Sequence, residues 1–163
     1  MTQGDYKDAR QWALRALGRR MHTAHEIRTV LSRRGCENNV VESVLEKLVQ
    51  QGYIDDLNFA RIWVASRSVH KLHGSLRLRQ DLRKKGVLDE IIDSALGDSL
   101  PDEEEVAIAI KAAEKKLRTI RSTGRATGVK GKDALYRHLR SRGFTTRVIS
   151  LAMAEIIFEE DSS

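Results

Sequence analysis

The sequence predicts an all-α protein made of three tandem three-helix repeats. Residue types that favour helices, mainly Leu, Ala, Arg, Glu and Lys, dominate its 163 residues, and it contains only one proline. A short pattern also recurs: residues 27–35 read IRTVLSRRG, residues 78–86 read LRQDLRKKG and residues 135–143 read LYRHLRSRG. Helical units of this size usually stack on one another, so we expect an elongated, curved helical array.

The recurring pattern has the features of a helix and its C-terminal cap. An aliphatic residue followed by Leu four positions later forms an apolar stripe on one helix face. Basic residues near the end of the pattern complement the negative end of the helix dipole. The glycine that closes it suits the left-handed conformation that ends many helices. Part of the basic character therefore has a purely structural cause.

Each pattern stands between two further candidate helices, which gives repeats at residues 1–50, 51–99 and 100–163. The helix after the glycine has a clear apolar face, formed in the first repeat by Val40, Val41, Val44, Leu45 and Leu48. The helix before the pattern is expected in the second repeat from apolar spacing at Phe59, Ile62, Trp63, Ser66 and Val69. We expect a mobile loop at residues 122–130, STGRATGVK, because this segment contains two glycines.

Charge and composition narrow the classes of partner. The formal net charge is +6 and the sequence pI is about 9.7, which favours a polyanionic partner over a neutral one. The single cysteine, Cys36, argues against an internal disulfide and a structural zinc site.

The N-terminus lacks a signal-peptide core, and no apolar run is long enough to cross a bilayer. We therefore expect a cytoplasmic protein that does not associate with membranes. We also expect the protein to be a monomer.

No pattern in the sequence indicates catalysis, a cofactor or a metal. The adjacent carboxylates of Asp55 and Asp56 could suggest metal-dependent phosphodiester chemistry, but such a site needs several converging carboxylates. They stand just before a predicted helix, where an N-cap is the better interpretation. An enzyme that acts on nucleic acid through these two residues is the weakest of the hypotheses.

Residues 52–87, GYIDDLNFARIWVASRSVHKLHGSLRLRQDLRKKGV, resemble the signature of the RecX family, which regulates the RecA recombinase. The matching residues are Gly52, Tyr53, Ile54, Asp55, Asp56, Phe59, Ala60, Arg67, Gly74, Leu78, Arg79, Leu82, Lys85 and Gly86. The resemblance implies a non-enzymatic protein that binds the groove of the RecA–DNA filament. Such proteins inhibit ATP hydrolysis, strand exchange and co-protease function, and so regulate DNA repair, recombination and the SOS response. Some members also bind DNA directly.

Basic residues beyond those needed for capping form the candidate binding surface. From Arg61 to Val87 there are eight Lys and Arg against one acidic residue, and from Lys111 to Arg147 there are twelve against two. If the repeats stack in register, these side chains form a stripe that suits phosphates or an acidic protein groove without base readout. The expected RecA- or DNA-binding residues are Arg67, Arg77, Arg79, Arg83, Lys84, Lys130, Lys132, Arg137, Arg140 and Arg142. A stand-alone, sequence-nonspecific DNA-binding module and an ordinary solvated surface remain the alternatives.

Overall fold

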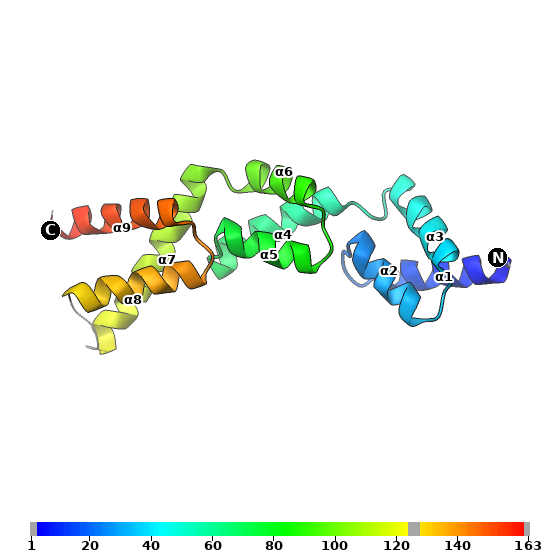
Figure 1. Cartoon of the computed structure of the whole chain (residues 1–163), viewed down its shortest axis with the longest axis horizontal. Coiled ribbons are helices and arrows are strands. Elements are labelled where there is room, and N and C mark those ends of the chain that lie inside the picture. Colours follow the sequence, from blue (N-terminus) through cyan, green and yellow to red (C-terminus); the bar gives the residue numbers. More distant parts are fainter. Residues whose placement is uncertain (1–2, 124–127, 162–163) are drawn as a thin grey trace. The chain divides into compact units, whose positions relative to one another are not determined.

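A computed structural model of the chain describes residues 3–123 and 128–161, in which every regular element is an α-helix (Figure 1). The helices are α1 (Gln3–Leu17), α2 (Ala24–Arg33), α3 (Asn38–Gln50), α4 (Asp56–Lys71), α5 (Ser75–Lys84), α6 (Asp89–Ser99), α7 (Asp102–Thr123), α8 (Gly128–Ser141) and α9 (Thr146–Asp161). The predicted all-α helical repeat is confirmed. Each repeat has a first helix (α1, α4 or α7), a middle helix with the recurring pattern (α2, α5 or α8) and a third helix (α3, α6 or α9).

The helices form two compact units whose limits differ from those of the repeats. Unit 1 comprises Met1–Ile62 and Leu82–Ser94, and unit 2 comprises Trp63–Asp81 and Ala95–Ser163. The division falls within α4, α5 and α6. The second repeat therefore contributes residues to both units.

The middle helices are built as the recurring pattern predicts. Their aliphatic pairs are 0–4% exposed; they are Ile27 and Leu31, Leu78 and Leu82, and Leu135 and Leu139. The closing glycines have positive φ angles of 80°, 74° and 84°, at Gly35, Gly86 and Gly143 respectively. At each of these turns the N–H after the glycine donates to the carbonyl of the second apolar residue of the pair. These bonds satisfy carbonyls at the helix end that would otherwise lack a donor.

The predicted apolar face of α4 was partly wrong. Ile62 and Val69 are 50% and 61% exposed, whereas Ala60 and Val64 are fully buried. The buried side of α4 therefore includes small side chains that the apolar spacing does not select. Alanines line the buried side of the other first helices as well; they are Ala9 and Ala13 in α1 and Ala109, Ala112 and Ala113 in α7.

The loop predicted at residues 122–130 is helical at both ends. Helix α7 continues to Thr123 and α8 begins at Gly128, while residues 124–127 lie outside the described part of the chain. In the described part of the chain, no helix combines the length and the apolar character needed to span a membrane.

Candidate functional site

Two of the predicted binding residues on α5 form ion pairs within their own unit. In unit 2, Arg77 Nε lies 3.4 Å from Asp81 Oδ1, one helical turn further on. In unit 1, Arg83 binds Asp89 with two bonds, Nε to Oδ1 at 2.7 Å and Nη2 to Oδ2 at 3.1 Å. Each of these guanidinium groups therefore has a carboxylate partner before any external ligand arrives.

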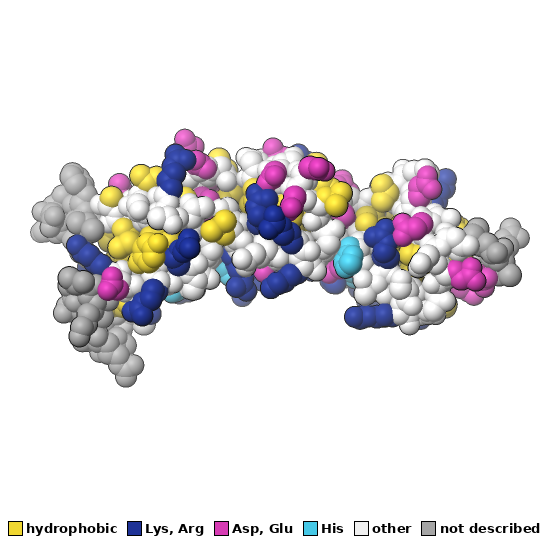
Figure 2. Space-filling model, viewed as in Figure 1, with side chains coloured by type: hydrophobic (Ala, Val, Ile, Leu, Met, Phe, Trp, Pro, Cys, Tyr) yellow, Lys and Arg dark blue, Asp and Glu magenta, His cyan; other side chains and the backbone are white. Residues whose placement is uncertain are grey.

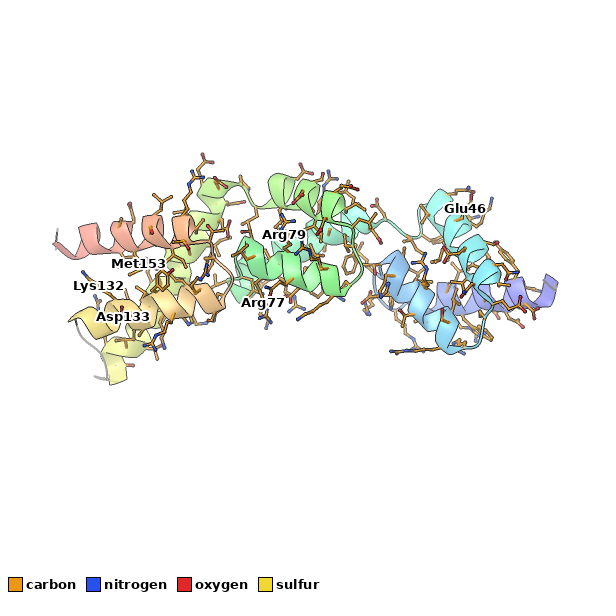
Figure 3. All side chains as sticks on the ribbon, in the orientation of Figure 1. Glu46, Arg77, Arg79, Lys132, Asp133 and Met153 are labelled. Carbon is orange, nitrogen blue, oxygen red and sulfur yellow. The ribbon has the colours of Figure 1, made fainter. Side chains whose placement is uncertain are left out.

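The remaining predicted residues of α5 differ in their exposure. Arg79 is half-buried, and Figure 3 shows it on the opposite side of the helix from Arg77. Lys84 is exposed and forms no ion pair with another described residue. Lys84 is thus the α5 cation that is best placed to meet a partner.

Arg67 and Arg142 are both engaged in contacts within unit 2. The Arg67 guanidinium carbon lies 4.4 Å from the centre of the Trp63 ring, a distance typical of a cation–π contact. The Arg142 guanidinium donates to the Lys71 carbonyl and, at 3.1 Å, to His138 Nε2. Arg67 is thus held against its own helix, whereas Arg142 links the end of α8 to the end of α4.

Helix α8 carries three exposed cations on its solvent side. Lys132, Arg137 and Arg140 are exposed and form no ion pair with another described residue. Arg137 Nε donates to the Asp133 carbonyl at 3.3 Å, within its own helix. At 3.6 residues per turn, Lys132, Tyr136 and Arg140 lie along one stripe of the helix, whereas Arg137 lies about 100° round the helix from Tyr136. Tyr136 is 37% exposed. The face is thus basic with an aromatic residue among the cations.

The figures show how this face is arranged. In Figure 3, Lys132 and Asp133 lie near the start of α8, and Met153 lies between α8 and α9. In Figure 2, Lys and Arg side chains over α8 and α9 form separate groups among hydrophobic side chains. The side chain of Lys130, another predicted binding residue, is outside the described part of the structure. Sequence reasoning missed Tyr136, although its spacing of four residues from Lys132 and Arg140 indicates the same face.

Unit 1 contains a contact between repeats that is built on the turn after α5. Thr23, the N-cap of α2, is fully buried and donates its hydroxyl to the Lys85 carbonyl at 2.7 Å. Lys85 Nζ lies 2.8 Å from Glu26 Oε1. The Ala24 N–H at the start of α2 donates to Asp56 Oδ1 at 2.9 Å. We call such a contact a repeat joint: a glycine turn after one middle helix, packed on the start of the preceding middle helix.

Unit 2 contains a second repeat joint, built on the turn after α8. The Gly74 N–H donates to the Arg142 carbonyl at 2.9 Å. The Ser75 N–H at the start of α5 donates to Glu105 Oε1 at 2.7 Å. Glu105 therefore does for α5 what Asp56 does for α2, since each supplies a carboxylate from the next repeat to cap the helix.

Both joints require glycine for space as well as for conformation. A Cβ on Gly86 would lie 2.3 Å from His25 Cβ, and a Cβ on Gly143 would lie 2.4 Å from the Arg77 Cβ and backbone nitrogen. Such distances are far inside van der Waals contact. Gly86 and Gly143 thus serve as helix caps and as contact points between repeats.

At the joint in unit 1, the neighbours of Glu26 lower the pKa of its carboxyl group. Burial raises the pKa of Glu26, but hydrogen bonds from Arg20 and Lys85 outweigh this effect and bring it to about 2. In the same unit, burial raises the pKa of Asp56 above its usual value, opposed by the hydrogen bond from Ala24. Glu26 thus stays charged over most of the pH range.

The two adjacent carboxylates once considered for catalysis have structural roles. Asp55 Oδ1 accepts the Asn58 N–H at 2.9 Å, so Asp55 caps the start of α4 as predicted. Asp56 is bonded to the Ala24 N–H in the joint. Among the described residues, no cluster of three or more His, Cys, Asp or Glu side chains is arranged to hold a metal ion.

Comparisons with known proteins agree with the resemblance read from residues 52–87. Family models named RecX, first three-helix domain, and RecX, second three-helix domain, match residues 9–48 and 55–96. A "Regulatory protein RecX" from Prosthecochloris aestuarii is 34% identical over 157 residues, spanning 96% of this chain and 99% of the relative. One from Chlorobium phaeobacteroides is 36% identical over 156 residues, spanning 96% and 98%.

Solved structures show the same fold. The crystal structure of RecX from Lactobacillus salivarius has a TM-score of 0.88 and 21% sequence identity, and covers 96% of this chain and 99% of that one. Another, titled crystal structure of regulatory protein RecX, has a TM-score of 0.81 and 27% identity, covering 92% and 72%. With two family domains and relatives that match along nearly their whole length, this chain belongs to the RecX family of regulatory proteins.

Proposed function

We propose that this protein is a negative modulator of the RecA recombinase. It binds the groove of the RecA–DNA filament and inhibits ATP hydrolysis, strand exchange and co-protease function, without itself being an enzyme. Membership of a family of regulatory proteins supports the class of function. The observation that carries the mode of binding is the exposed face of α8, with Lys132, Arg137 and Arg140 around Tyr136.

The proposed mechanism needs only non-covalent contacts. Three exposed cations on the solvent side of one helix can neutralise phosphates of the filament's DNA or carboxylates that line its groove. Neither contact reads base sequence, which suits a regulator of filaments on any DNA. Occupation of the groove would then block the entry of duplex DNA. In unit 1, Lys84 is a further exposed cation that forms no ion pair with another described residue.

The test is RecA ATPase activity on single-stranded DNA with the full-length protein added. The wild type should inhibit hydrolysis, and the triple variant Lys132→Ala, Arg137→Ala, Arg140→Ala should need about tenfold more protein for the same effect. A matched control removes three exposed cations from the first repeat: Lys7→Ala, Arg19→Ala, Lys47→Ala. It changes the net charge equally and should inhibit as the wild type does. Unchanged ATPase at saturating wild-type protein would refute the function, and equal inhibition by both triple variants would refute the site.

Tyr136 favours a second candidate function, which is direct binding of single-stranded DNA. An exposed aromatic ring among cations is a common arrangement for stacking bases while lysines and arginines follow the backbone. If this is the main activity, the protein binds DNA at physiological salt without RecA, and Tyr136→Ala weakens that binding. If it binds only assembled filaments, the first function stands.

A further inference from the structure

The first repeat carries the residues of one half of a repeat joint. Asp5 and Asp56 lie 30 residues before Gly35 and Gly86 respectively, and Trp12 and Trp63 lie 23 residues before them. Arg34 precedes its glycine as Lys85 and Arg142 precede theirs. The turn after α2 therefore has the composition of the turns that pack against a preceding helix start in the two observed joints.

In the first repeat this turn faces open space. Gly35 has a φ of +80°, as the joint glycines do, yet a Cβ placed on it would meet nothing within 4 Å. An open pocket of about 270 Å³ lies beside it, lined by Asp5, Asp8, Trp12, Arg34, Gly35, Cys36, Glu37 and Val40. The Arg34 guanidinium covers Trp12, with 5.0 Å between its carbon and the ring centre. Cys36 is only half-buried, whereas its counterparts Val87 and Phe144 are buried.

The charge at the pocket fits the start of a helix. Three carboxylates line it, from Asp5, Asp8 and Glu37. A helix N-terminus presents N–H groups without intrahelical partners and a positive partial charge, so carboxylates attract it. In unit 1 the same chemistry joins Asp56 to the Ala24 N–H, and Lys85 to Glu26 at the third position of the helix.

We propose that this pocket docks the N-terminus of a helix from a partner protein, with a small polar cap residue and an acidic residue at its third position. In the bound state, Asp5 accepts an N–H of the incoming helix and Arg34 pairs with its acidic residue. The Gly35 turn packs on the helix start as Gly86 packs on His25. This inference rests on the geometry of the joints and is independent of RecA binding.

We assign the occupant to another protein, because the comparable helix starts in the described part of the chain are already occupied or lie inside a helix. The starts of α2 and α5 already hold the turns after α5 and α8. In the third repeat, Gly131 stands 12 residues before Gly143, as Thr23 stands before Gly35. Helix α8, however, begins at Gly128, so the N–H groups that follow Gly131 lie inside the helix.

The test uses the full-length protein and a helical peptide as the probe. The peptide has the sequence of residues 22–33, HTAHEIRTVLSR, with Ile27→Gln and Leu31→Gln for solubility and a hydrocarbon staple between positions 28 and 32. The staple is needed because isolated helices of this length are marginal. Fluorescence anisotropy of the labelled peptide should show saturable binding. Binding should also slow alkylation of Cys36, the only thiol of the chain, because that residue lines the pocket.

The chain offers a matched pair of variants for this experiment. Gly35→Asn puts a Cβ into the joint while Asn tolerates the left-handed conformation, and it should weaken peptide binding about tenfold or more. Gly52→Asn is the control, since Gly52 has a φ of +73° and equally open surroundings but lies outside the pocket. Circular dichroism confirms that both variants fold.

Each outcome of these experiments either supports or overturns the docking proposal. A peptide carrying Glu26→Lys should bind more weakly, because it sets a lysine against Arg34. Equal affinity of wild type and Gly35→Asn, or an unchanged rate of Cys36 alkylation, overturns the proposal. The proposal is also overturned if the wild type self-associates and Gly35→Asn abolishes this self-association. The occupant of the pocket would then be a second copy of the chain. None of these readouts involves the filament, so failure here leaves the RecA proposal untouched, and the reverse holds as well.

Discussion

Gly35 and Gly86 share a left-handed backbone conformation but differ in what surrounds them. Alanine at either position adopts an unfavourable φ, which costs about 1 kcal/mol. At Gly86 the added methyl group also meets His25 at 2.3 Å, so the joint must shift. We therefore expect Gly35→Ala to lower the free energy of unfolding by about 1 kcal/mol and Gly86→Ala by about 3 kcal/mol. Urea denaturation measures both, and equal losses would mean that the joint yields without cost.

Glu26 makes the stability of unit 1 depend on pH. Its pKa falls from 4.5 to about 2 on folding, so the folded state binds its proton less readily than the unfolded chain does. Its contribution is complete above about pH 4.5 and is lost as the pH falls towards 2. Glu26→Gln should cost on the order of 2 kcal/mol at pH 7 and much less near pH 2.

The control for this prediction is Glu42, which pairs with Arg28 on the surface. The Arg28 guanidinium lowers the pKa of Glu42, but the carboxylate side chain is 59% exposed and solvent weakens the interaction. Glu42→Gln should therefore change stability by at most about 0.5 kcal/mol. Denaturation curves collected from pH 2 to 7 compare the two variants. If Glu26→Gln shows the same pH dependence as the wild type, Glu26 is not the group responsible.

At the scale of single residues, the sequence predicted caps better than it predicted charged surfaces. The glycine caps and the Asp55 cap depend on neighbours within a few residues, and all are confirmed. The partners of a charged side chain often come from distant elements. Arg142 donates to the Lys71 carbonyl, 71 residues away, and no local pattern indicates this contact.

At the scale of elements, the start of α5 depends on a carboxylate from another repeat. Glu105 is 5% exposed and its Oε1 accepts the Ser75 N–H at 2.7 Å. Glu105→Ala leaves that N–H without its acceptor and should cost about 2 kcal/mol, whereas Glu105→Gln retains a carbonyl acceptor and should cost less. Glu104→Ala, at an exposed position on the same helix, is the control. Hydrogen exchange at Ser75 should accelerate in Glu105→Ala alone; equal protection in all three variants would contradict this role.

The helices themselves differ in how well the sequence predicts their buried faces. The third helices have β-branched and Leu residues at helical spacing, and the predicted face of α3 is buried throughout. In α4 the apolar spacing favours Ile62 and Val69, yet Ala60 and Val64 are the buried residues. Alanine contributes little to an apolar pattern, so a buried face that contains alanine is hard to recognise from sequence.

At the scale of the whole molecule, the repeats are not the units of packing. The turn after α5 packs on α2, and the turn after α8 packs on α5, so each joint lies within one unit while the second repeat is divided. The sequence predicts the repeats because they share local patterns. It does not predict the joints, since their carboxylates stand at different positions of the first helix: Asp56 is the first residue of α4, whereas Glu105 is the fourth of α7.

The distribution of charge leads to a prediction for the whole protein. The net charge is +6, and between Lys111 and Arg147 twelve basic residues face only two acidic ones. Any direct binding to DNA should therefore release counterions mainly through unit 2, and its affinity should fall steeply with salt. Each lost phosphate contact lowers the slope of log K against log salt by about 1. The triple variant Lys132→Ala, Arg137→Ala, Arg140→Ala should thus lower the slope by about 2 to 3, and Lys7→Ala, Arg19→Ala, Lys47→Ala should leave it unchanged.

Fluorescence titrations with labelled single-stranded DNA across salt concentrations measure both slopes. A slope that falls equally in the two variants would show that DNA senses only the net charge, and would assign the α8 face to a protein partner instead.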